Sequence, residues 1–432
     1  MNRSEQFVYE VCRHSFLSLW SHATPRGKDP GKELSDVLVV CDPDIVIVSV
    51  KEITVTDSGD TFTDWRRWQK RAIEDSAKQI YGAERWLRSA TRVVRADGSL
   101  GLELPSLKER RIHRVAVSLG GEGKVPLKFG DFGKGFVHVL DAPAFRILLA
   151  ELDTITDFVD YLSAKERLLA AGKKVTFVGA EEDLLALYLH GGREFPQQYD
   201  RIVIDDTLWR GFQDRPEYKA KNIANADSYV WDKLIEALVR REPEIGPELS
   251  VAESAIRIMA RENRFARRVL GQAFKEFLEE RVARARITRS PSGIVYVFLA
   301  VPHGTEQQRL QSELGLRCFV ARGQFPENKT VVGIGTEYFE NDKSSMLFFY
   351  YLRKESWEAE DEAIAKGIRE ELGLFAAPQT KSVHIDEYPG ATNGDTSNVA
   401  EFPTQELSDS GPSIARKKAS NRVKRTSAKY NR

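Results

Sequence analysis

The sequence predicts an α/β protein with more than one domain. Two short apolar runs, Val37–Val40 and Ile45–Val48, are rich in β-branched residues, and the turn-forming residues Asp42-Pro43-Asp44 lie between them. Neither run alternates with polar residues, which predicts two strands buried on both faces, as in the centre of an α/β sheet. The chain of 432 residues is long enough for two or three domains.

Amphipathic helices are expected on either side of this hairpin. In Ser4–Trp20 apolar residues recur at helical spacing, and Ser4 is the expected N-cap. A second, longer helix is expected to begin at Asp64, as its N-cap, and to reach Leu87. Its apolar stripe and its many basic residues lie on different sides, which predicts that one side packs on a sheet and the other meets solvent or a ligand.

Further strands complete the first domain. Residues 111–119 and 135–140 have strand composition, and a weaker strand pattern lies in 54–61. The order helix, strand, strand, helix, strand, strand predicts a mixed sheet covered by helices. The domain is expected to span residues 1–150.

The rest of the chain changes character twice. Residues 151–285 show mainly helical spacing, and 286–388 again combine strand and helix patterns, which predicts a helical middle region and a small C-terminal α/β domain. In this last domain the expected strands are 293–300, 316–321, 330–334 and 346–352, and the expected helix is 357–372. Residues 389–432 are polar, and 416–432 contain eight Lys or Arg and no acid. This predicts a disordered basic tail that binds phosphates or keeps the chain soluble.

Composition excludes several classes of protein. Lys+Arg and Asp+Glu both number 64, so the chain has no overall basic field and charge must be judged locally. Three cysteines are too few and too scattered for a disulfide framework, and no CxxC pair points to zinc. The first residues lack a signal-peptide core, and no apolar run approaches the ~20 residues of a spanning helix. We expect a cytoplasmic protein without a membrane partner.

Charged residues gather at one end of the hairpin. Glu33 and Asp36 precede its first strand, and Lys51 and Glu52 end its second. Charged groups at the end of a buried strand are usually paired with each other or bind a metal. A carboxylate can hold a hard divalent ion such as Mg²⁺, and a neighbouring lysine can orient water beside a phosphate.

This arrangement resembles the PD-(D/E)XK nuclease superfamily, which includes restriction endonucleases and Holliday-junction resolvases. Asp36 matches the Asp of its motif, and Ser49-Val50-Lys51 lies where the acid-x-Lys triplet is expected. Ser49 departs from the pattern because it replaces the second acid. The resemblance covers residues 1–150 and implies a restriction-endonuclease-like mixed sheet sandwiched by helices.

The resemblance also implies a Mg²⁺ or Mn²⁺ site. Asp36 would hold the metal, with Glu10 of the first helix or Glu52 completing the ligand set and the carbonyl of Val50 as a further ligand. A solvent-facing role for Glu10 is the alternative.

The resemblance implies catalytic roles for two further positions. Lys51 would orient the attacking water. Gln79 or Lys78, on the long helix, would position the phosphate, although Tyr81 is too close to Gln79 for the Gln-x-x-x-Tyr pattern of some members.

The first half of the long helix is a candidate nucleic-acid surface. Arg66, Arg67, Lys70 and Lys78 are interleaved with tryptophans, a combination that suits phosphates and stacked bases. The alternative is a solvated helix face whose charges pair at i,i+4, such as Lys70 with Glu74.

These observations predict a bacterial, cytoplasmic, metal-dependent nuclease that cleaves DNA. Defence against foreign DNA follows by analogy with the superfamily only, as does action with a partner protein of the same system or as a homo-oligomer. Ser49 keeps two other functions open. One is a non-catalytic nucleic-acid-binding module on a nuclease-like scaffold, and the other is an assembly subunit whose activity lies in a partner.

Overall fold

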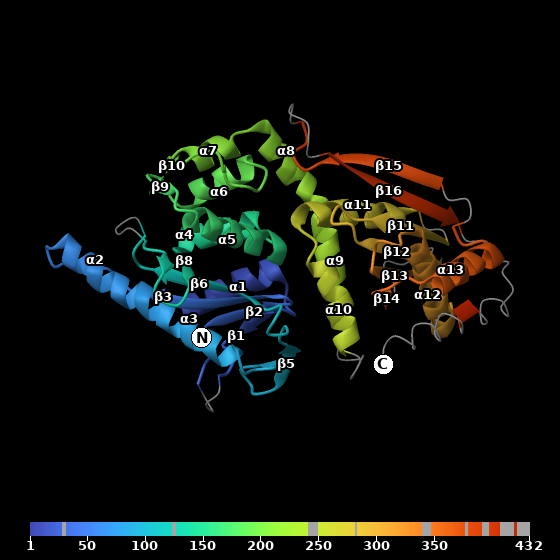
Figure 1. Cartoon of the computed structure of the whole chain (residues 1–432), viewed down its shortest axis with the longest axis horizontal. Coiled ribbons are helices and arrows are strands. Elements are labelled where there is room, and N and C mark those ends of the chain that lie inside the picture. The colour runs from blue at the N-terminus through green and yellow to red at the C-terminus, as the bar shows by residue number, and fades with distance from the viewer. Residues whose placement is uncertain are drawn as a thin grey trace. The chain divides into compact units, whose positions relative to one another are not determined.

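The computed structural model describes residues 1–27, 32–122, 127–240, 249–280, 283–338, 347–375, 379–390, 397–406 and 419–420. The chain forms two compact units, Met1–Arg215 and Pro216–Arg432. Each unit combines helices with a six-stranded mixed sheet, so the predicted α/β class is confirmed (Figure 1).

The sheet of unit 1 is built around the predicted hairpin, in the strand order β1-β2-β3-β6-β8-β7. The strands are β1 (Ser21–Ala23), β2 (Val37–Cys41), β3 (Asp44–Glu52), β6 (Arg111–Leu119), β7 (Gly130–Asp131) and β8 (Phe136–Leu140). β2 is antiparallel to β1 and to β3, whereas β3, β6 and β8 are parallel. Cys41 pairs with Asp44 and Val37 with Val48, so a two-residue turn sets the register of the hairpin.

Helices cover both faces of this sheet. Side chains alternate between the faces along each strand. Leu38, Val40 and Ile47 share a core with the long helix, which consists of α2 (Thr61–Gln69), the π-helical turn η1 (Lys70–Glu74) and α3 (Asp75–Leu87). On the other face, α1 (Arg3–Phe16) contacts β2 and β3, and α4 (Ala142–Glu151) contacts β6. Each fully buried aliphatic or aromatic side chain contributes roughly 1.5–3 kcal/mol, so this two-sided burial holds the strands in place.

α1 begins earlier and ends earlier than the sequence predicts. Asn2, not Ser4, is the N-cap: its side chain accepts the Glu5 N–H at 2.9 Å, and the Glu5 carboxylate accepts the Asn2 N–H at 2.8 Å. This capping box satisfies two main-chain donors that a helix start leaves open. The helix ends at Phe16 instead of continuing to Trp20, because Leu17 adopts a φ of 68°.

The long helix begins at Thr61, and its N-cap is Asp60, not Asp64. Asp60 Oδ1 accepts the N–H groups of Phe62 and Thr63. Asp64 lies inside α2, is buried, and accepts a 2.7 Å hydrogen bond from the Ser58 N–H. These contacts hold the preceding loop against α2. Residues 54–60 form no strand, so the weak strand pattern in 54–61 is not realised.

Unit 1 continues past the expected boundary at residue 150. Its further elements are the hairpin β4 (Arg92–Val94) and β5 (Leu100–Glu103), α5 (Ile155–Ala170), the parallel pair β9 (Lys174–Phe177) and β10 (Arg201–Ile204), α6 (Glu181–His190) and α7 (Leu208–Gln213). Phe158 of α5 packs on Phe16 of α1 with ring centroids 5.3 Å apart. Ser15 Oγ donates to the Leu149 carbonyl at 3.0 Å. These contacts join the later helices to the first sheet in one compact unit.

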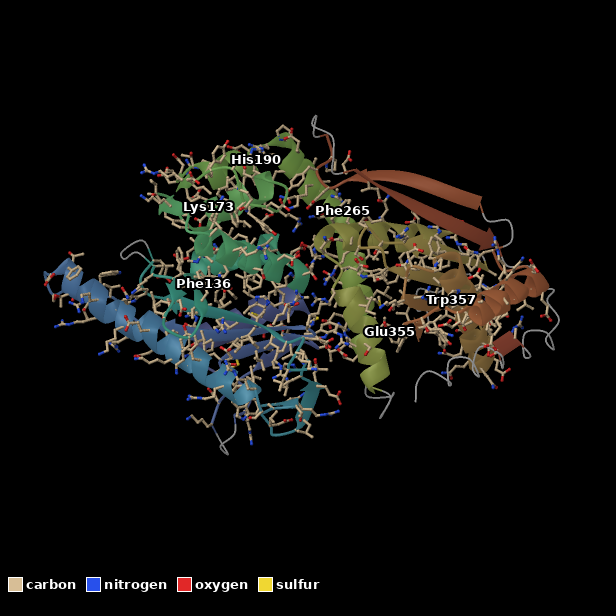
Figure 2. All side chains as sticks on the ribbon, in the orientation of Figure 1. Phe136, Lys173, His190, Phe265, Glu355 and Trp357 are labelled. Atoms are coloured by element: carbon tan, nitrogen blue, oxygen red, sulfur yellow. The ribbon has the colours of Figure 1, made fainter. Side chains whose placement is uncertain are left out.

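Unit 2 contains a second sheet, in the order β14-β13-β12-β11-β16-β15. Its strands are β11 (Arg284–Arg289), β12 (Val295–Pro302), β13 (Thr330–Tyr338), β14 (Leu347–Arg353), β15 (Gln379–Asp386) and β16 (Ser397–Glu406). β12 and β13 are parallel and the other neighbours antiparallel. The sheet shares a core with α12 (Gln307–Gln324) and α13 (Ala359–Leu372). The ring of Trp357, which Figure 2 labels, packs on that of Phe319 of α12, with ring centroids 5.1 Å apart.

A second group of helices packs on aromatic residues of β12. It consists of α8 (Pro216–Ala224), the 3₁₀ turn η2 (Asn225–Asp227), α9 (Ser228–Arg240), α10 (Leu249–Ala260) and α11 (Arg264–Glu279). The rings of Trp231 and Tyr296 lie 5.1 Å apart, as do those of Phe274 and Phe298. The expected boundary at residue 285 therefore falls inside a packed unit, at the start of β11.

Two predictions for unit 2 are wrong. Residues 316–321 belong to helix α12, not to a strand: this helix is buried on most sides, Arg317 and Arg322 included, so it shows no amphipathic period. Disorder was expected over 389–432, but Ser397–Glu406 forms β16, because pairing with β11 and β15 satisfies its main chain despite its polar composition. Apart from 419–420, the remainder of the basic tail lies outside the described residues. None of the described helices combines the length and apolar composition that a membrane span requires.

Candidate active site

Asp36 lies at the entrance to β2 and is 4% exposed. Its Oδ2 accepts the main-chain N–H of Val50 at 2.6 Å, which fixes the carboxylate against β3. Within the described residues, Oδ1 has no hydrogen-bond partner. Burial raises the pKa of Asp36, the Val50 N–H and the Lys51 charge oppose that rise, and Glu5 and Glu33 add to it. A cation beside Oδ1 would therefore stabilise the ionised form of Asp36.

Ser49 and Lys51 lie on the face of β3 that is turned toward the long helix. Ser49 is fully buried, and its Oγ donates to the Gln79 side-chain oxygen of α3 at 3.2 Å. Lys51 follows two residues later on the same face, and its neighbour on β6, Ser118, donates to the Ala72 carbonyl of η1. The ammonium of Lys51 is partly exposed and, among the described residues, makes no hydrogen bond or ion pair. The structure thus brings Asp36, Ser49, Lys51 and Gln79 together.

Glu52 and Glu10 lie apart from this group. Glu52 alternates to the opposite face of β3, where it accepts a hydrogen bond from Ser4 Oγ. Glu10 accepts from the Gln6 side chain at 2.7 Å and pairs with Arg13 at 3.5 Å on an exposed part of α1. Neither carboxylate is among the charges that chiefly act on Asp36.

The acid of α1 that acts on Asp36 is Glu5, which sequence reasoning missed. The Ser4–Glu52 hydrogen bond places the first turn of α1 beside the end of β3. Glu10 is five residues further on, about 140° around the helix from Glu5. The Asn2-x-x-Glu5 pattern is a capping-box signal that marks this first turn, but it does not reveal which strand end the turn approaches.

The donor set fits a hard divalent ion that is held weakly. Among the described residues, no group of three or more His, Cys, Asp or Glu is placed to hold a metal. Asp36 provides one carboxylate, and Glu5 and Glu33 lie near enough to add negative charge. Mg²⁺ commonly keeps several waters and binds proteins through one or two carboxylates together with substrate phosphates. Asp36 suits that mode, whereas the set would not suit an ion that needs a full cage of protein ligands.

The predicted basic residues divide into two kinds. Arg66, Arg67 and Lys70 are exposed and form no ion pair within the described part of the chain. The expected i,i+4 pair of Lys70 with Glu74 is not found there, and Glu74 accepts instead from the Gln69 side chain at 3.2 Å. Lys78 is exposed and pairs with Asp75 at 2.8 Å, while its neighbour Gln79 faces Ser49. Gln79, and not Lys78, therefore belongs to the Asp36 group.

A hollow of about 470 Å³ lies beside α3. Its walls include four cationic residues, two acids and Tyr81. The cations are Lys78, Arg85, Lys128 and Lys134, and the acids are Glu74 and Asp131. The Tyr81 hydroxyl is held between the Gly135 carbonyl, to which it donates at 2.6 Å, and the Phe132 N–H. The hollow therefore has mixed charge, with cations in excess.

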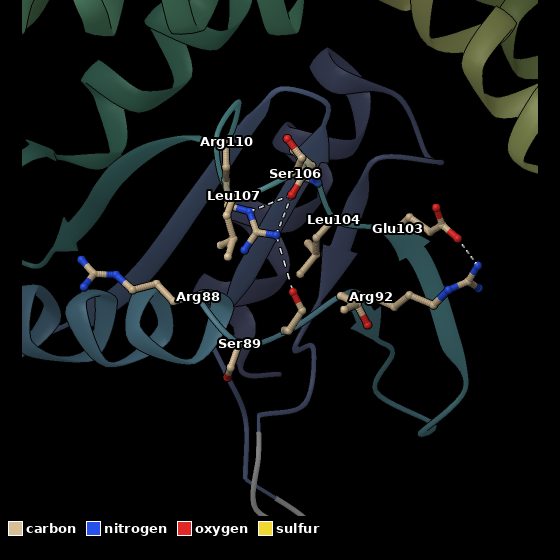
Figure 3. A pocket seen from close by; sticks show the side chains of 11 residues that line it. Arg88, Ser89, Arg92, Glu103, Leu104, Ser106, Leu107 and Arg110 are labelled. Carbon is tan, nitrogen blue, oxygen red and sulfur yellow. Dashed lines mark hydrogen bonds and ion pairs between the residues drawn. The ribbon is translucent and has the colours of Figure 1, made fainter.

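A second hollow of about 480 Å³ lies at the C-terminal end of α3 (Figure 3). Its arginines already have partners. Arg110 donates to the Leu87 and Pro105 carbonyls, and Arg92 pairs with Glu103 at 2.5 Å. Its charges therefore stabilise the end of the helix and the β4–β5 hairpin, and they are not available to an anion without breaking those contacts.

The long helix and the hairpin together place one buried carboxylate, one unpaired lysine and one amide at the same end of a sheet. Comparison of the chain with models of known protein families and with curated proteins finds no match. The function of this site is therefore inferred from its own residues.

Proposed function

We propose that unit 1 is a metal-dependent phosphodiesterase that cleaves DNA, on a PD-(D/E)XK-like scaffold in which Ser49 replaces the second acid. The observation that carries the proposal is the hydrogen bond from the Val50 N–H to Asp36, which sets the carboxylate beside Ser49-Val50-Lys51. The order α1, β2, β3, α3, β6, β8 and the helices on both faces of the sheet also support it, because they agree with the core of that superfamily.

Each residue of the group has a chemical role in this proposal. Asp36 would hold Mg²⁺ or Mn²⁺, and the Val50 carbonyl is a further candidate ligand. The bound ion would supply charge stabilisation to the phosphate and lower the pKa of a bound water. Lys51, with no competing partner among the described residues, is free to orient that water. The Gln79 amide, whose oxygen accepts from Ser49, would position a phosphate oxygen.

The test is a cleavage assay with a matched variant. Purified full-length protein is incubated with plasmid and end-labelled linear DNA in Mg²⁺, Mn²⁺ or EDTA, beside Lys51→Met purified in the same way. Because Lys51 makes no hydrogen bond or ion pair with a described residue, and interacts with Asp36 through its charge alone, this variant should keep the circular dichroism spectrum of the wild type and a melting temperature close to it. We expect cleavage by the wild type with a divalent ion only, and none by Lys51→Met. Equal cleavage by both proteins would refute the assignment.

The second candidate is a non-catalytic nucleic-acid-binding or assembly subunit. It is favoured by the buried Ser49–Gln79 hydrogen bond, which occupies the place of the second acid, and by the single carboxylate of the site. In that case DNA binding would be the same with Mg²⁺ and with EDTA, and calorimetry would detect no Mg²⁺ site. By analogy with the superfamily, either function would operate on foreign DNA in the cytoplasm, as a homo-oligomer or with a partner protein.

A further inference from the structure

Phe62, in the first turn of α2, is the most exposed aromatic side chain among the described residues, at 63%. The guanidinium carbon of Arg66 lies 5.7 Å from the centre of its ring, and the ring of Trp65 is 5.8 Å away. Leaving a phenylalanine exposed forgoes roughly 1.5–3 kcal/mol of burial. A single exposed apolar residue is nonetheless common, so its surroundings decide whether it has a role.

Those surroundings are cationic and unpaired. Arg66, Arg67, Lys70 and Arg71 are exposed, and within the described residues none of them forms an ion pair. Two acids lie on the same stretch. Asp64 is buried, accepts hydrogen bonds from Thr56 and Ser58, and is acted on by the charge of Arg67. Asp60 is exposed and accepts the N–H groups of Phe62 and Thr63. The four cations outnumber these two acids, so the surface keeps an excess of positive charge.

The positions of these residues put ring and charge side by side. Phe62, Arg66 and Lys70 follow each other at i,i+4 spacing, which places them on one face of the helix. Asp64 and Trp68, both buried, occupy the opposite face. Figure 1 shows α2 as the end of the long helix that extends past the strands of unit 1.

We propose that the outward face of α2 is a stacking platform for unpaired bases, so that the nucleic acid bound by unit 1 is single-stranded where it crosses Phe62. This proposal rests on the proposed function, and it names the form of the substrate. The cations would contact phosphates and the ring would stack on a base. In a duplex the faces of the bases are stacked on each other. A duplex would therefore bind the cations through its phosphates and would not stack on Phe62.

The experiment measures binding without cleavage. Full-length protein in EDTA is titrated against a labelled DNA strand without self-complementarity, the RNA strand of the same sequence and the DNA duplex, with fluorescence anisotropy as the readout. The variants are Phe62→Ala, Phe62→Leu and Phe62→Tyr. Leu100→Ala is the matched control, because Leu100 is also 63% exposed but lies on β5.

We expect Phe62→Ala and Phe62→Leu to weaken single-strand binding roughly 5- to 150-fold, the range for loss of one stacked base. Phe62→Tyr and Leu100→Ala should bind as the wild type does. The salt dependence of binding should not change, because no phosphate contact is lost. Dependence on Phe62 with both DNA and RNA strands would assign the platform to unpaired bases of either kind, and dependence with one would assign it to that polymer.

Three results would overturn the platform. They are single-strand binding that does not depend on Phe62, wild-type affinity in Phe62→Leu, and duplex binding that falls as much as single-strand binding in Phe62→Ala. A further refuting result would be that polyglutamate competes with the DNA strand for binding and that Phe62→Ala weakens polyglutamate binding equally. The surface would then be assigned to an acidic protein. Binding is measured in EDTA, without cleavage, so the two proposals can fail separately. If single-strand binding depends on Phe62 but the protein never cleaves DNA with a divalent ion, the nuclease is refuted and the platform is not.

Discussion

Asp36 can be tested by two substitutions that separate its structural role from its chemical one. Its Oδ2 accepts the Val50 N–H at 2.6 Å in a buried setting. Asp36→Asn keeps an oxygen that can accept this N–H but removes the charge. Asp36→Ala removes both, and leaves the Val50 N–H without an acceptor.

The difference in stability between the two variants follows from that N–H. A buried donor without a partner costs about 1–3 kcal/mol. For a unit of this size, 1 kcal/mol shifts the melting temperature by roughly 2–4 °C, so Asp36→Ala should melt about 2–12 °C below Asp36→Asn.

The raised pKa of Asp36 determines how the stability of the wild type changes with pH. Burial raises the pKa of Asp36 above its ordinary value of 3.8, so the folded state binds more protons than the unfolded state in the pH range above 3.8. The stability of the wild type therefore falls as the pH rises from 3.8 through the raised pKa. Asp36→Asn lacks this loss, so at neutral pH it should be at least as stable as the wild type, and the advantage should vanish below pH 3.8.

Activity should respond differently from stability. If Asp36 holds the metal, both variants lose several kcal/mol of transition-state stabilisation, on the order of a 10³-fold loss of rate or more. Single-turnover cleavage of end-labelled DNA and thermal melts across the pH range measure the two effects. Cleavage by Asp36→Asn within tenfold of the wild-type rate would show that the carboxylate is structural only.

Three further variants probe the surroundings of Asp36 and the long helix. Glu5→Gln can keep the capping box and should raise the Mg²⁺ concentration needed for half-maximal cleavage about fivefold, because two unit charges interact by roughly 1 kcal/mol in water. Glu10→Gln should leave this concentration unchanged. Equal effects of the two substitutions would show that Glu10 also belongs to the site. Changing Arg66, Arg67 and Lys70 to Glu should reduce the slope of log K against log salt for a single strand by about 2.1, at ~0.7 per lost phosphate contact. Lys78→Glu, whose ammonium already pairs with Asp75, should change this slope less. An unaltered slope would make that face ordinary solvated surface. Ser49→Glu should lower the melting temperature, because overpacking a buried position costs about 1–3 kcal/mol. Mg²⁺ should restore part of this loss if the new carboxylate faces the ion. A melting temperature that does not change with Mg²⁺ would show that Ser49 lies away from any metal.

The centre of unit 1 could be predicted because its signals are local. The apolar runs identify two buried strands, and the short turn between them leaves one register in which Asp36 lies opposite Ser49. The proximity of Asp36 and Lys51 then follows from the hairpin alone. Gln79 required the resemblance as well, since nothing in its own sequence shows that it faces the sheet.

The errors arose where distant packing decides the structure. A helix buried on most sides, as α12 is, lacks the stripe that distinguishes a helix from a strand. β16 forms because edges of β11 and β15 accept it, which composition cannot show. The sequence indicates Glu10 and not Glu5, because the rotation of α1 about its axis depends on which of its residues pack on β2 and β3. The compact units end at other residues than the expected domains, since α5 packs on α1 and α9 packs on β12, elements far away in the sequence.

Lys51, rather than Asp36, is the residue that best separates the proposed enzyme from a non-catalytic protein with the same fold. Asp36 holds the Val50 N–H, so a protein that had lost its chemistry would still keep this acid to stabilise the hairpin. Ser49 and Gln79 hold each other and could persist in the same way. Lys51 makes no hydrogen bond or ion pair with any described residue, yet it stands at the end of a buried strand and acts on the Asp36 carboxylate. The charge of Lys51 favours the ionised form of the buried Asp36, but no described residue fixes its ammonium, so under the proposed function Lys51 would be free to orient a water beside a phosphate.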